Sequence, residues 1–253
     1  MDDARRLGYL RAMGVTQWVP RAPIQASPAT PVGTPGDLGP AARVADESSP
    51  APAAGADPGA LGRADPAVTN WEALEQAVSG CRACGLWETR TQTVFGVGNR
   101  DADLLVIGEA PGAEEDRAGE PFVGRAGRLL NLMLAAIGLP RDQVYIANIL
   151  KCRPPGNRDP KPEEGRTCEP YLLRQIALIR PRLILAVGRV SAQTLLGTDA
   201  PVGRLRGRWF SVGPAETPLR VTYHPAYLLR SPEQKAKAWE DLTAVARRLD
   251  IGH

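Results

Sequence analysis

From about Val68 to the end of the chain, short apolar segments alternate with segments that have a helical pattern of apolar residues. Four apolar segments are expected to form strands: residues 103–108, 143–150, 183–187 and 219–223. Helical patterns cover residues 126–137, part of 162–179, 190–196 and 232–249. This alternation is typical of a parallel sheet covered by helices on both faces. We therefore predict a three-layer α/β/α domain over residues 68–253, with a central, mainly parallel four-stranded sheet.

The first 67 residues have a different character. Residues 1–20 predict a short helix followed by an extended peptide, because Leu7, Leu10 and Met13 recur at a spacing of three before Gly14. Residues 21–67 are dominated by Pro, Ala, Gly and Asp and contain no aromatic residue. Such a segment cannot bury enough apolar surface to offset the entropy lost on ordering. We expect it to be a disordered linker.

The net charge does not identify a partner, but the lack of long apolar segments argues against a membrane or secreted protein. The formal net charge of +3 is too small by itself to indicate a nucleic-acid partner. No apolar run is long enough to span a bilayer, and the N-terminus lacks the apolar segment of a secretion signal. We therefore expect a cytoplasmic protein without membrane contact. Disulfides are rare in that compartment, so the four cysteines need another explanation.

The cysteines have the spacing of a metal site. Cys81 and Cys84 form a C-x2-C pair, and Cys152 and Cys168 follow with fifteen residues between them. Four unrelated thiols are the less favoured alternative, because the chain has only four and two of them are at chelating spacing. Four thiolates suit either zinc or an iron–sulfur cluster, and spacing alone does not separate the two. The site would join the segment before the sheet to the loop after its second strand.

Two motifs follow the first predicted strand. Gly108-Glu109-Ala110-Pro111-Gly112-Ala113-Glu114-Glu115-Asp116 makes a tight turn but lacks the Gly-Lys-Ser/Thr ending of a phosphate-binding loop. Its carboxylates suit a water that must be activated, although they also suit an acidic helix N-terminus. Phe122 follows in a loop rich in Gly and Pro. There it can stack on a base or anchor the loop to the core.

Polar residues also lie at the ends of the second and fourth predicted strands. The amide of Asn148 carries an acceptor and a donor, so it can read the edge of a base that presents one of each. The next loop supplies basic residues for phosphate contacts, namely Arg153, Arg158 and Lys161. His224 begins a segment whose Leu228, Leu229 and Arg230 could wedge into a base step and hold the backbone.

Taken together, residues 71–249 resemble the family 4 uracil-DNA glycosylases, the thermophile-type enzymes that carry a [4Fe-4S] cluster. The resemblance rests on GEAPGAEED at 108–116, PFVGRAG at 121–127, NILKCRPPGNRDP at 148–160 and HPAYLLR at 224–230. It implies that the uracil is held by Gly108, Glu109, Ala110, Phe122, Asn148 and His224. It also implies that His224 stabilises the departing base and that Glu115, or else Glu109, orients the water. Cys81, Cys84, Cys152 and Cys168 would hold the cluster.

The resemblance further predicts a monofunctional, monomeric enzyme of base excision repair that acts on a flipped deoxyuridine in single- or double-stranded DNA. One relative in this superfamily remains covalently attached to DNA through a histidine inserted after the Asn strand. Residues 149–168 contain no histidine, so turnover is expected. The alternatives are a wider base range, such as hypoxanthine or mismatched thymine, and a non-enzymatic nucleic-acid-binding module with structural zinc.

The N-terminal peptide carries a separate resemblance. Residues 1–21 are similar to the N-terminal peptide of the psi subunit of the bacterial DNA polymerase III clamp loader, with Trp18 near the end. This similarity implies a contact with the clamp loader that would tether the enzyme to the replisome. The alternative is a helix that packs on its own catalytic domain.

Overall fold

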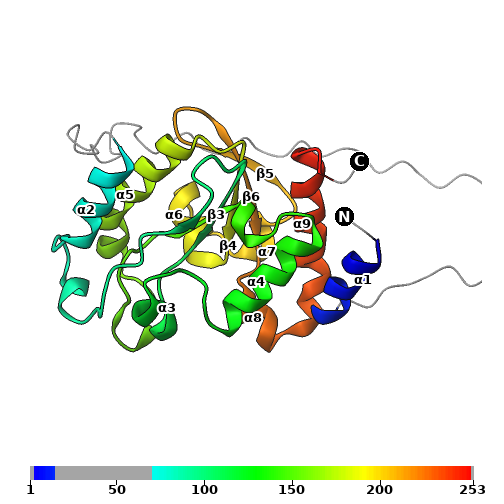
Figure 1. Ribbon diagram of the computed structural model, residues 1–253, viewed down its shortest axis with the longest axis horizontal. Coiled ribbons are helices and arrows are strands. Elements are labelled where there is room, and N and C mark those ends of the chain that lie inside the picture. The colour runs from blue at the N-terminus through cyan, green and yellow to red at the C-terminus, as the bar shows by residue number, and fades with distance from the viewer. Residues whose placement is uncertain (1–2, 15–69, 252–253) are drawn as a thin grey trace, which may run out of the picture.

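The computed structural model describes residues 3–14 and 70–251, and its described part is a three-layer α/β/α fold around one mixed sheet (Figure 1). The sheet has the order β1-β3-β2-β4-β6-β5. Its strands are β1 (Val97–Gly98), β2 (Leu104–Gly108), β3 (Tyr145–Asn148), β4 (Leu183–Val187), β5 (Trp209–Val212) and β6 (Thr217–Thr222). The central four strands run parallel, which confirms the predicted fold class.

The two edge strands are antiparallel and were not predicted. β1 has only two residues, so it offers no period to detect. β5 is half-exposed along most of its length and therefore lacks the continuous apolar run of a central strand. By contrast, every residue of β2 and β4 is buried, which explains why these two were predicted closely.

Helices cover both faces of the sheet. On one face, α1 (Asp3–Ala12), α4 (Arg125–Ala136), α8 (Pro225–Arg230) and α9 (Lys235–Arg248) enclose one apolar core. On the other, α2 (Trp71–Ser79), α5 (Pro162–Ile179), α6 (Arg189–Leu196) and α7 (Val202–Leu205) enclose a second. The remaining helix, α3 (Ala113–Ala118), follows β2. The expected helices correspond to α4, α5, α6 and α9, whereas α2, α3, α7 and α8 were not predicted. Of these, α3, α7 and α8 have only six, four and six residues, too few to show a helical period.

The N-terminal helix belongs to the folded domain. α1 lies within the segment where a helix is expected. Leu10 in this helix and Met13 directly after it are 7% and 3% exposed in the core that α4 and α9 share. Leu7, by contrast, is 40% exposed. This packing supports the alternative in which the helix docks on its own catalytic domain. The predicted extension over 15–20 and the linker over 21–67 lie outside the described residues.

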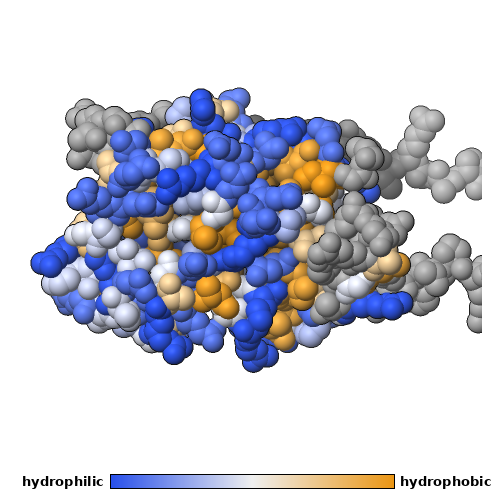
Figure 2. All heavy atoms as spheres, in the orientation of Figure 1, coloured by the Kyte–Doolittle hydropathy of each residue, from blue (hydrophilic) through white to orange (hydrophobic). Residues whose placement is uncertain are grey.

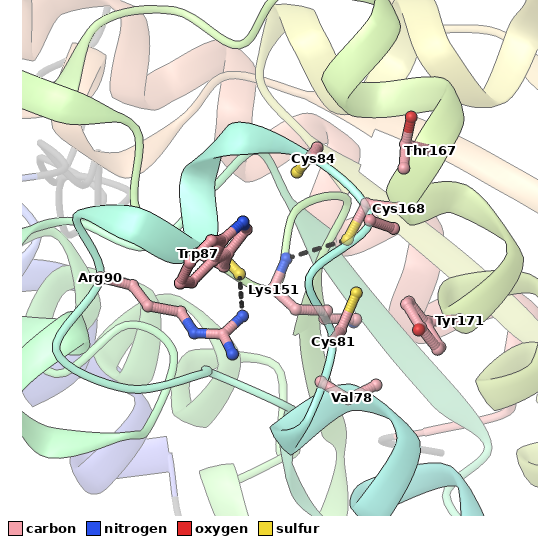
Figure 3. A pocket seen from close by; sticks show the side chains of 11 residues that line it. Val78, Cys81, Cys84, Trp87, Arg90, Lys151, Thr167, Cys168 and Tyr171 are labelled. Carbon is pink, nitrogen blue, oxygen red and sulfur yellow. Dashed lines mark hydrogen bonds between the residues drawn. The ribbon is translucent and has the colours of Figure 1, made fainter.

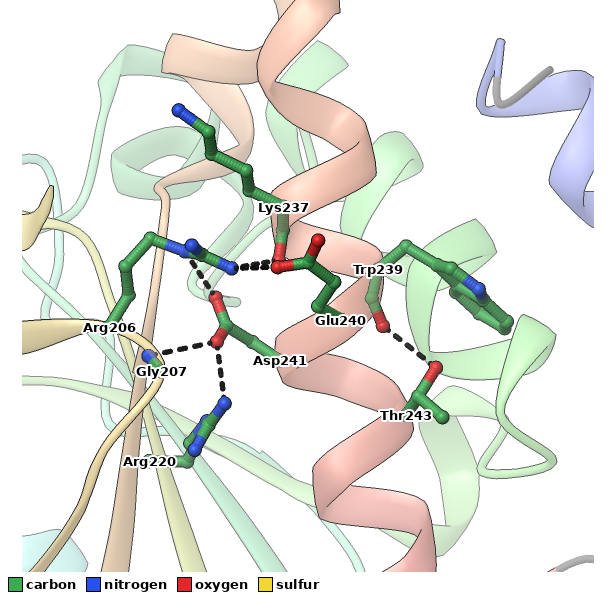
Figure 4. Close-up of polar contacts among 8 residues, drawn as sticks. All are labelled: Arg206, Gly207, Arg220, Lys237, Trp239, Glu240, Asp241 and Thr243. Atoms are coloured by element: carbon green, nitrogen blue, oxygen red, sulfur yellow. Dashed lines mark hydrogen bonds and ion pairs between the residues drawn. The ribbon is translucent and has the colours of Figure 1, made fainter. Parts of the chain in front are cut away.

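A buried carboxylate ties α9 to the sheet edge (Figure 4). Asp241, which is inaccessible to solvent, accepts hydrogen bonds from Arg206 Nε and Arg220 Nη2, each at 3.0 Å, and from the backbone N–H of Gly207. Arg206 also reaches the exposed Glu240 at 2.9 Å. These contacts join α9, β6 and the turn between α7 and β5.

The molecular surface in Figure 2 is mainly hydrophilic, with apolar side chains in small groups between the polar ones. No helix of the described part is long and apolar enough to cross a membrane.

Candidate active site and metal centre

A cleft of about 810 Å³ lies beyond the carboxyl ends of the four parallel strands. Ligands bind at this end of open α/β sheets, because the loops that follow the strands diverge there. The predicted site residues that line the cleft are Glu109, Ala110, Glu115, Phe122, Asn148, Arg158, His224 and Arg230. The structure therefore brings together residues that are up to 121 positions apart in the chain.

The base of the cleft is formed where β2 and β3 end side by side. Gly108 pairs with Asn148, and a Cβ at Gly108 would lie 2.4 Å from Asn148 Oδ1 and 2.6 Å from Phe122 Cζ. Only glycine therefore lets the amide and the ring meet at this point. Asn148 is 2% exposed, yet its side chain makes no hydrogen bond with any residue that the structure describes. Asn148 lines the cleft, so the donor and the acceptor of its amide are available to a ligand.

Phe122 closes one side of the base of the cleft. It has a positive φ of 54°, and a Cβ at Gly127 would lie 1.8 Å from its carbonyl oxygen, so Gly127 allows the loop to approach α4. The ring stacks on His224 with centroids 5.6 Å apart and planes inclined by 30°. Phe122 is 6% exposed and belongs to the core while it also lines the cleft. Phe122 therefore anchors its loop to the core and also presents its ring to the cleft.

His224 is the N-cap of α8, and one nitrogen of its ring already accepts a hydrogen bond. Nδ1 accepts the backbone N–H of Ala226 at 3.1 Å. A neutral imidazole whose Nδ1 accepts carries its proton on Nε2. Burial lowers the pKa of His224 to about 4, with Arg230 lowering it further and Glu115 opposing the shift. At neutral pH the ring is therefore an uncharged Nε2–H donor.

Glu109 follows β2 and lines the cleft. Burial raises the pKa of its carboxyl group to about 7; Asp159 adds to the shift and Arg189 opposes it. Its carboxylate makes no hydrogen bond with any side chain or backbone group in the described ranges. A group with such a pKa can exchange a proton near neutrality, as a general base must.

Glu115 has a different environment. Its Oε1 accepts the backbone N–H groups of Val123 and Gly124 at 3.0 and 3.1 Å, and its Oε2 accepts that of Gly112 at 3.1 Å. The carboxylate thus fastens the turn after β2 to the loop that carries Phe122. Much of its hydrogen-bonding capacity is used in doing so.

Basic residues stand around the cleft, although not all those predicted line it. Arg158 and Arg230 do, and Arg158 also forms a two-point ion pair with the buried Glu164, at 2.6 and 2.9 Å. Arg189, at the start of α6, also lines the cleft and forms an ion pair with Asp159. The predicted Arg153 and Lys161 do not line the cleft, and Arg153 donates to Asn157 at 2.7 Å.

The predicted apolar wedge must be corrected in one position. Leu228 is 1% exposed and lies in the core with α4 and α9, so it is not available to contact DNA. Leu229 is 38% exposed and Arg230 is exposed as well. The two leucines differ because successive residues of a helix point about 100° apart, and α8 buries only one face.

The four cysteines surround a second pocket, which Figure 3 shows from close by. Cys81 and Cys84 come from the segment after α2, Cys152 from the loop after β3, and Cys168 from α5. In the described residues, no three His, Cys, Asp or Glu side chains are placed to hold one metal ion. Cysteines from the segment before the sheet and from the loop after β3 thus line one pocket, as the predicted site requires.

The surroundings of the sulfur atoms fit an anionic, metal-bound ligand set. Arg90 Nη1 donates to Cys152 Sγ at 3.0 Å, and the backbone N–H of Lys151 donates to Cys168 Sγ at 3.3 Å (Figure 3). Burial raises the pKa of the Cys168 thiol to about 12, and that of Cys152 is raised as well. Free thiols here would stay protonated, whereas a bound metal would deprotonate them, and the donors would then stabilise the thiolates.

Several cleft residues were missed by sequence analysis. They are Pro154, Asn157, Gly188, Arg189, Val202, Gly203, Tyr223 and Tyr227. Arg189 could have been found, since Gly188-Arg189 directly follows a predicted strand, as the other motifs do. Val202 and Gly203 belong to α7, which gave no sequence signal.

Comparisons of the sequence with known proteins identify relatives of this chain. A sequence profile described as the uracil DNA glycosylase superfamily matches residues 95–243, which contain all six described strands. A type-4 uracil-DNA glycosylase of Archaeoglobus fulgidus is 44% identical over 178 residues, covering 68% of this chain and 89% of the relative. One of Thermotoga maritima is 43% identical over 164 residues, covering 63% and 83%. A type-5 uracil-DNA glycosylase of Mycobacterium leprae is 34% identical over 187 residues, covering 65% and 80%.

Proposed function

Since the chain belongs to the uracil DNA glycosylase superfamily, and to its type-4 group, we propose that the strand-end cleft is where it removes uracil from DNA. As a uracil-DNA glycosylase the protein hydrolyses the bond between uracil and deoxyribose, which leaves an abasic site for repair. The observation that carries the assignment to this cleft is the buried amide of Asn148, which has no partner among the described residues and lies beside Phe122.

Uracil recognition follows from the groups at the base of the cleft. The base must leave the helical stack to reach them, at a cost of about a few kcal/mol that is smallest in single strands and mispairs. Asn148 then reads O4 and N3–H with its amide, and Phe122 stacks on the ring. The backbone of Gly108, Glu109 and Ala110 contributes main-chain hydrogen bonds at the same edge.

Bond cleavage leaves negative charge on the uracil, and His224 is the residue that meets it. Its Nε2–H donates to O2 while Nδ1 stays bound to Ala226. A neutral donor that is already oriented stabilises the developing anion without rearranging during the reaction. The lowered pKa of His224 supports this role, because the ring does not bring a fixed positive charge into the empty cleft.

Two carboxylates compete for the task of orienting the water, and the geometry favours Glu109. Glu115 already accepts three backbone N–H groups, so it holds the loop of Phe122 in place. Glu109 has a pKa raised to about 7 and faces the cleft. We therefore assign the water to Glu109, in place of the Glu115 favoured from sequence.

DNA is held at the rim of the cleft. Arg158, Arg189 and Arg230 supply charge for phosphates, and Leu229 is the exposed apolar side chain that can fill the space left by an extruded base. Arg153 and Lys161 remain candidates for phosphate contacts further along the strand.

The four cysteines are proposed to hold a [4Fe-4S] cluster, as the resemblance to family 4 implies. When bound, the cluster supplies a structural cross-link between the segment after α2, the loop after β3 and α5. The thiol environment suits any thiolate-bound metal, so iron is distinguished from zinc by measurement. A cluster gives a brown protein with iron and acid-labile sulfide, whereas a zinc protein is colourless.

A partner for residues 1–21 remains part of the proposal. Leu10 and Met13 are occupied within the domain, so a clamp-loader contact would use Leu7 and the residues after Gly14, which include Trp18. Retention of clamp-loader subunits by residues 1–25, and loss of retention with Trp18→Ala, is the expected result. Equal retention by both peptides, or none by either, would contradict the proposal.

The activity assignment is tested with a uracil-containing oligonucleotide followed by alkaline cleavage at abasic sites. We expect Asn148→Ala and His224→Ala to lose about 100-fold or more in rate, because each removes a polar contact to the base. Full activity in both variants would contradict the site. Oligonucleotides with hypoxanthine or mismatched thymine measure the base range, and denaturing gels measure turnover, since a heat-stable protein–DNA adduct is not expected.

A further inference from the structure

A lysine is completely buried between the two sites. Lys151 is 1% exposed and lies between Asn148, at the end of β3, and Cys152 in the metal pocket. Burying an ammonium group is costly, and an apolar side chain of similar length would fill the same space without that cost. No carboxylate within the described ranges forms an ion pair with it. Its presence therefore calls for a specific function.

The ammonium group of Lys151 has two precise partners. Nζ donates to the backbone carbonyl of Asn148 at 3.0 Å and to Gln175 Oε1 at 2.6 Å. Gln175, which is inaccessible to solvent, donates from Nε2 to the Phe95 carbonyl at 3.0 Å. That bond fixes the direction of the amide, so Oε1 must face Lys151. Gln175 of α5 thus orients the lysine, and the lysine in turn donates a hydrogen bond to the end of β3.

The main chain of Lys151 also makes two hydrogen bonds. Its N–H donates to Cys168 Sγ at 3.3 Å, and its carbonyl accepts the N–H of Val94 at 2.8 Å. Between Asn148 and Lys151, the N–H groups of Ile149 and Leu150 bond to the carbonyls of Gly108 and Glu109. Figure 3 shows Lys151 among the side chains that line the cysteine pocket. One short segment therefore connects the pocket to the base of the cleft.

We propose that Lys151, oriented by Gln175, is a positioning residue that sets the main chain of Asn148 relative to the metal pocket and so aims the uracil-reading amide. The inference rests on the proposed role of Asn148. Lys151 is buried, so it acts through Asn148 and does not contact DNA itself. A shift of about 1 Å in a recognition group can cost on the order of 100-fold in rate, so a single hydrogen bond at this carbonyl matters.

The test is Lys151→Met, which keeps the length of the side chain and removes the donor. We expect iron and sulfide per chain to match the wild type, and the visible absorbance to be unchanged. The kcat for uracil excision should fall about 10-fold to 100-fold. Inhibition by free uracil should weaken by a similar factor, whereas KM for DNA should change little, because the phosphate contacts lie elsewhere.

Arg90→Met is the matched control. Arg90 donates to Cys152 Sγ from another side of the pocket and makes no contact with Asn148. We expect this variant to lose the cluster faster and to lose excision in proportion to iron, with unchanged inhibition by uracil in the molecules that keep iron. If Lys151→Met behaves in the same way as Arg90→Met, the residue acts only through the metal centre and the inference is overturned.

A double-mutant cycle separates this inference from the proposed function. Lys151→Met should have little further effect in the Asn148→Ala background, because both changes remove the same recognition. Additive losses would overturn the positioning role. A fully active Asn148→Ala would instead overturn the site assignment itself. If Lys151→Met does not yield folded protein, Gln175→Met, which removes the acceptor that orients the lysine, is expected to weaken uracil inhibition in the same direction, and unchanged inhibition would count against the proposal.

Discussion

At the scale of single residues, Glu109 shows how burial in the fold changes the pKa of a carboxyl group. The same sequence motif offers Glu109, Glu114 and Glu115, and nothing in their order distinguishes the one that acts on water. In the fold, Glu115 is occupied by three backbone donors, while Glu109 lies partly buried near Asp159 and Arg189. Burial is the larger cause of its raised pKa, and the nearby charges adjust it.

The pH dependence of excision tests this assignment. With a pKa of about 7, Glu109 becomes the active carboxylate as the pH rises, so kcat/KM should increase through pH 7 and level off above it. Asp159→Asn should move the midpoint to lower pH, because the neighbouring negative charge raises the pKa. Arg189→Met should move it to higher pH for the opposite reason. A midpoint that stays at pH 7 in Glu109→Gln would exclude Glu109 as its source.

At the scale of elements, α8 places two adjacent leucines in different environments. Leu228 packs into the core beside α4 and α9, and Leu229 faces solvent next to the cleft-lining Arg230. Six residues are too few for a helical period to be recognised in the sequence. The motif identified the segment but not the face that each leucine takes.

Excision rates on duplex and on single-stranded DNA should distinguish the roles of the two leucines. Leu229→Ala should lower excision from duplex DNA more than from single strands, because only the duplex requires extrusion of a stacked base. Leu228→Ala should lower the free energy of unfolding by about 2–5 kcal/mol and affect both substrates alike. The measurements are excision rates on matched duplex and single-stranded oligonucleotides, with urea unfolding of each variant. Equal losses on both substrates with Leu229→Ala would argue against the wedge.

The contacts of α9 lead to a prediction about stability. Asp241→Ala leaves Arg206 and Arg220 without their buried anion, so it should destabilise the fold by about 3–5 kcal/mol. Glu240→Gln removes the pair between Arg206 and an exposed carboxylate, and should cost less than about 1 kcal/mol. Thermal unfolding of the two variants measures the difference. Similar stabilities would show that Asp241 is not the anchor of α9.

At the scale of the whole molecule, α1 extends the folded domain beyond the region that the superfamily profile matches. The superfamily profile begins at residue 95, yet α1 packs against α4 and places Met13 beside Leu129, Leu228 and Leu242. The helix therefore helps to enclose the core behind α8.

Deletion of α1 is expected to weaken the domain. Met13→Ala should lower the free energy of unfolding by about 2 kcal/mol or more, because it removes a side chain that is 3% exposed. Leu7→Ala, at a position that is 40% exposed, should stay within about 0.5 kcal/mol of the wild type. Urea unfolding of both variants and of a chain lacking residues 1–14 gives the measurement. Unchanged stability in the shortened chain would mean that the docking of α1 contributes nothing.

The sequence by itself determined the layered α/β fold, the central strands and the family. It could do so because buried parallel strands are continuous apolar runs, and because the motifs at their ends are contiguous in the chain. Asn148 could also be selected as a candidate from the sequence, since an amide at the end of an apolar strand is costly without a partner.

Tertiary structure alone decided which carboxylate is available in the cleft, which leucine of α8 is exposed, and where α1 packs. It also brought Arg189 to the cleft and Lys151 between the cleft and the cysteines. Each of these depends on distances between segments that are far apart in the chain, or on which side of a short helix meets the core. Local patterns carry no record of such distances, because burial and charge at a site are set by neighbours that the fold brings together.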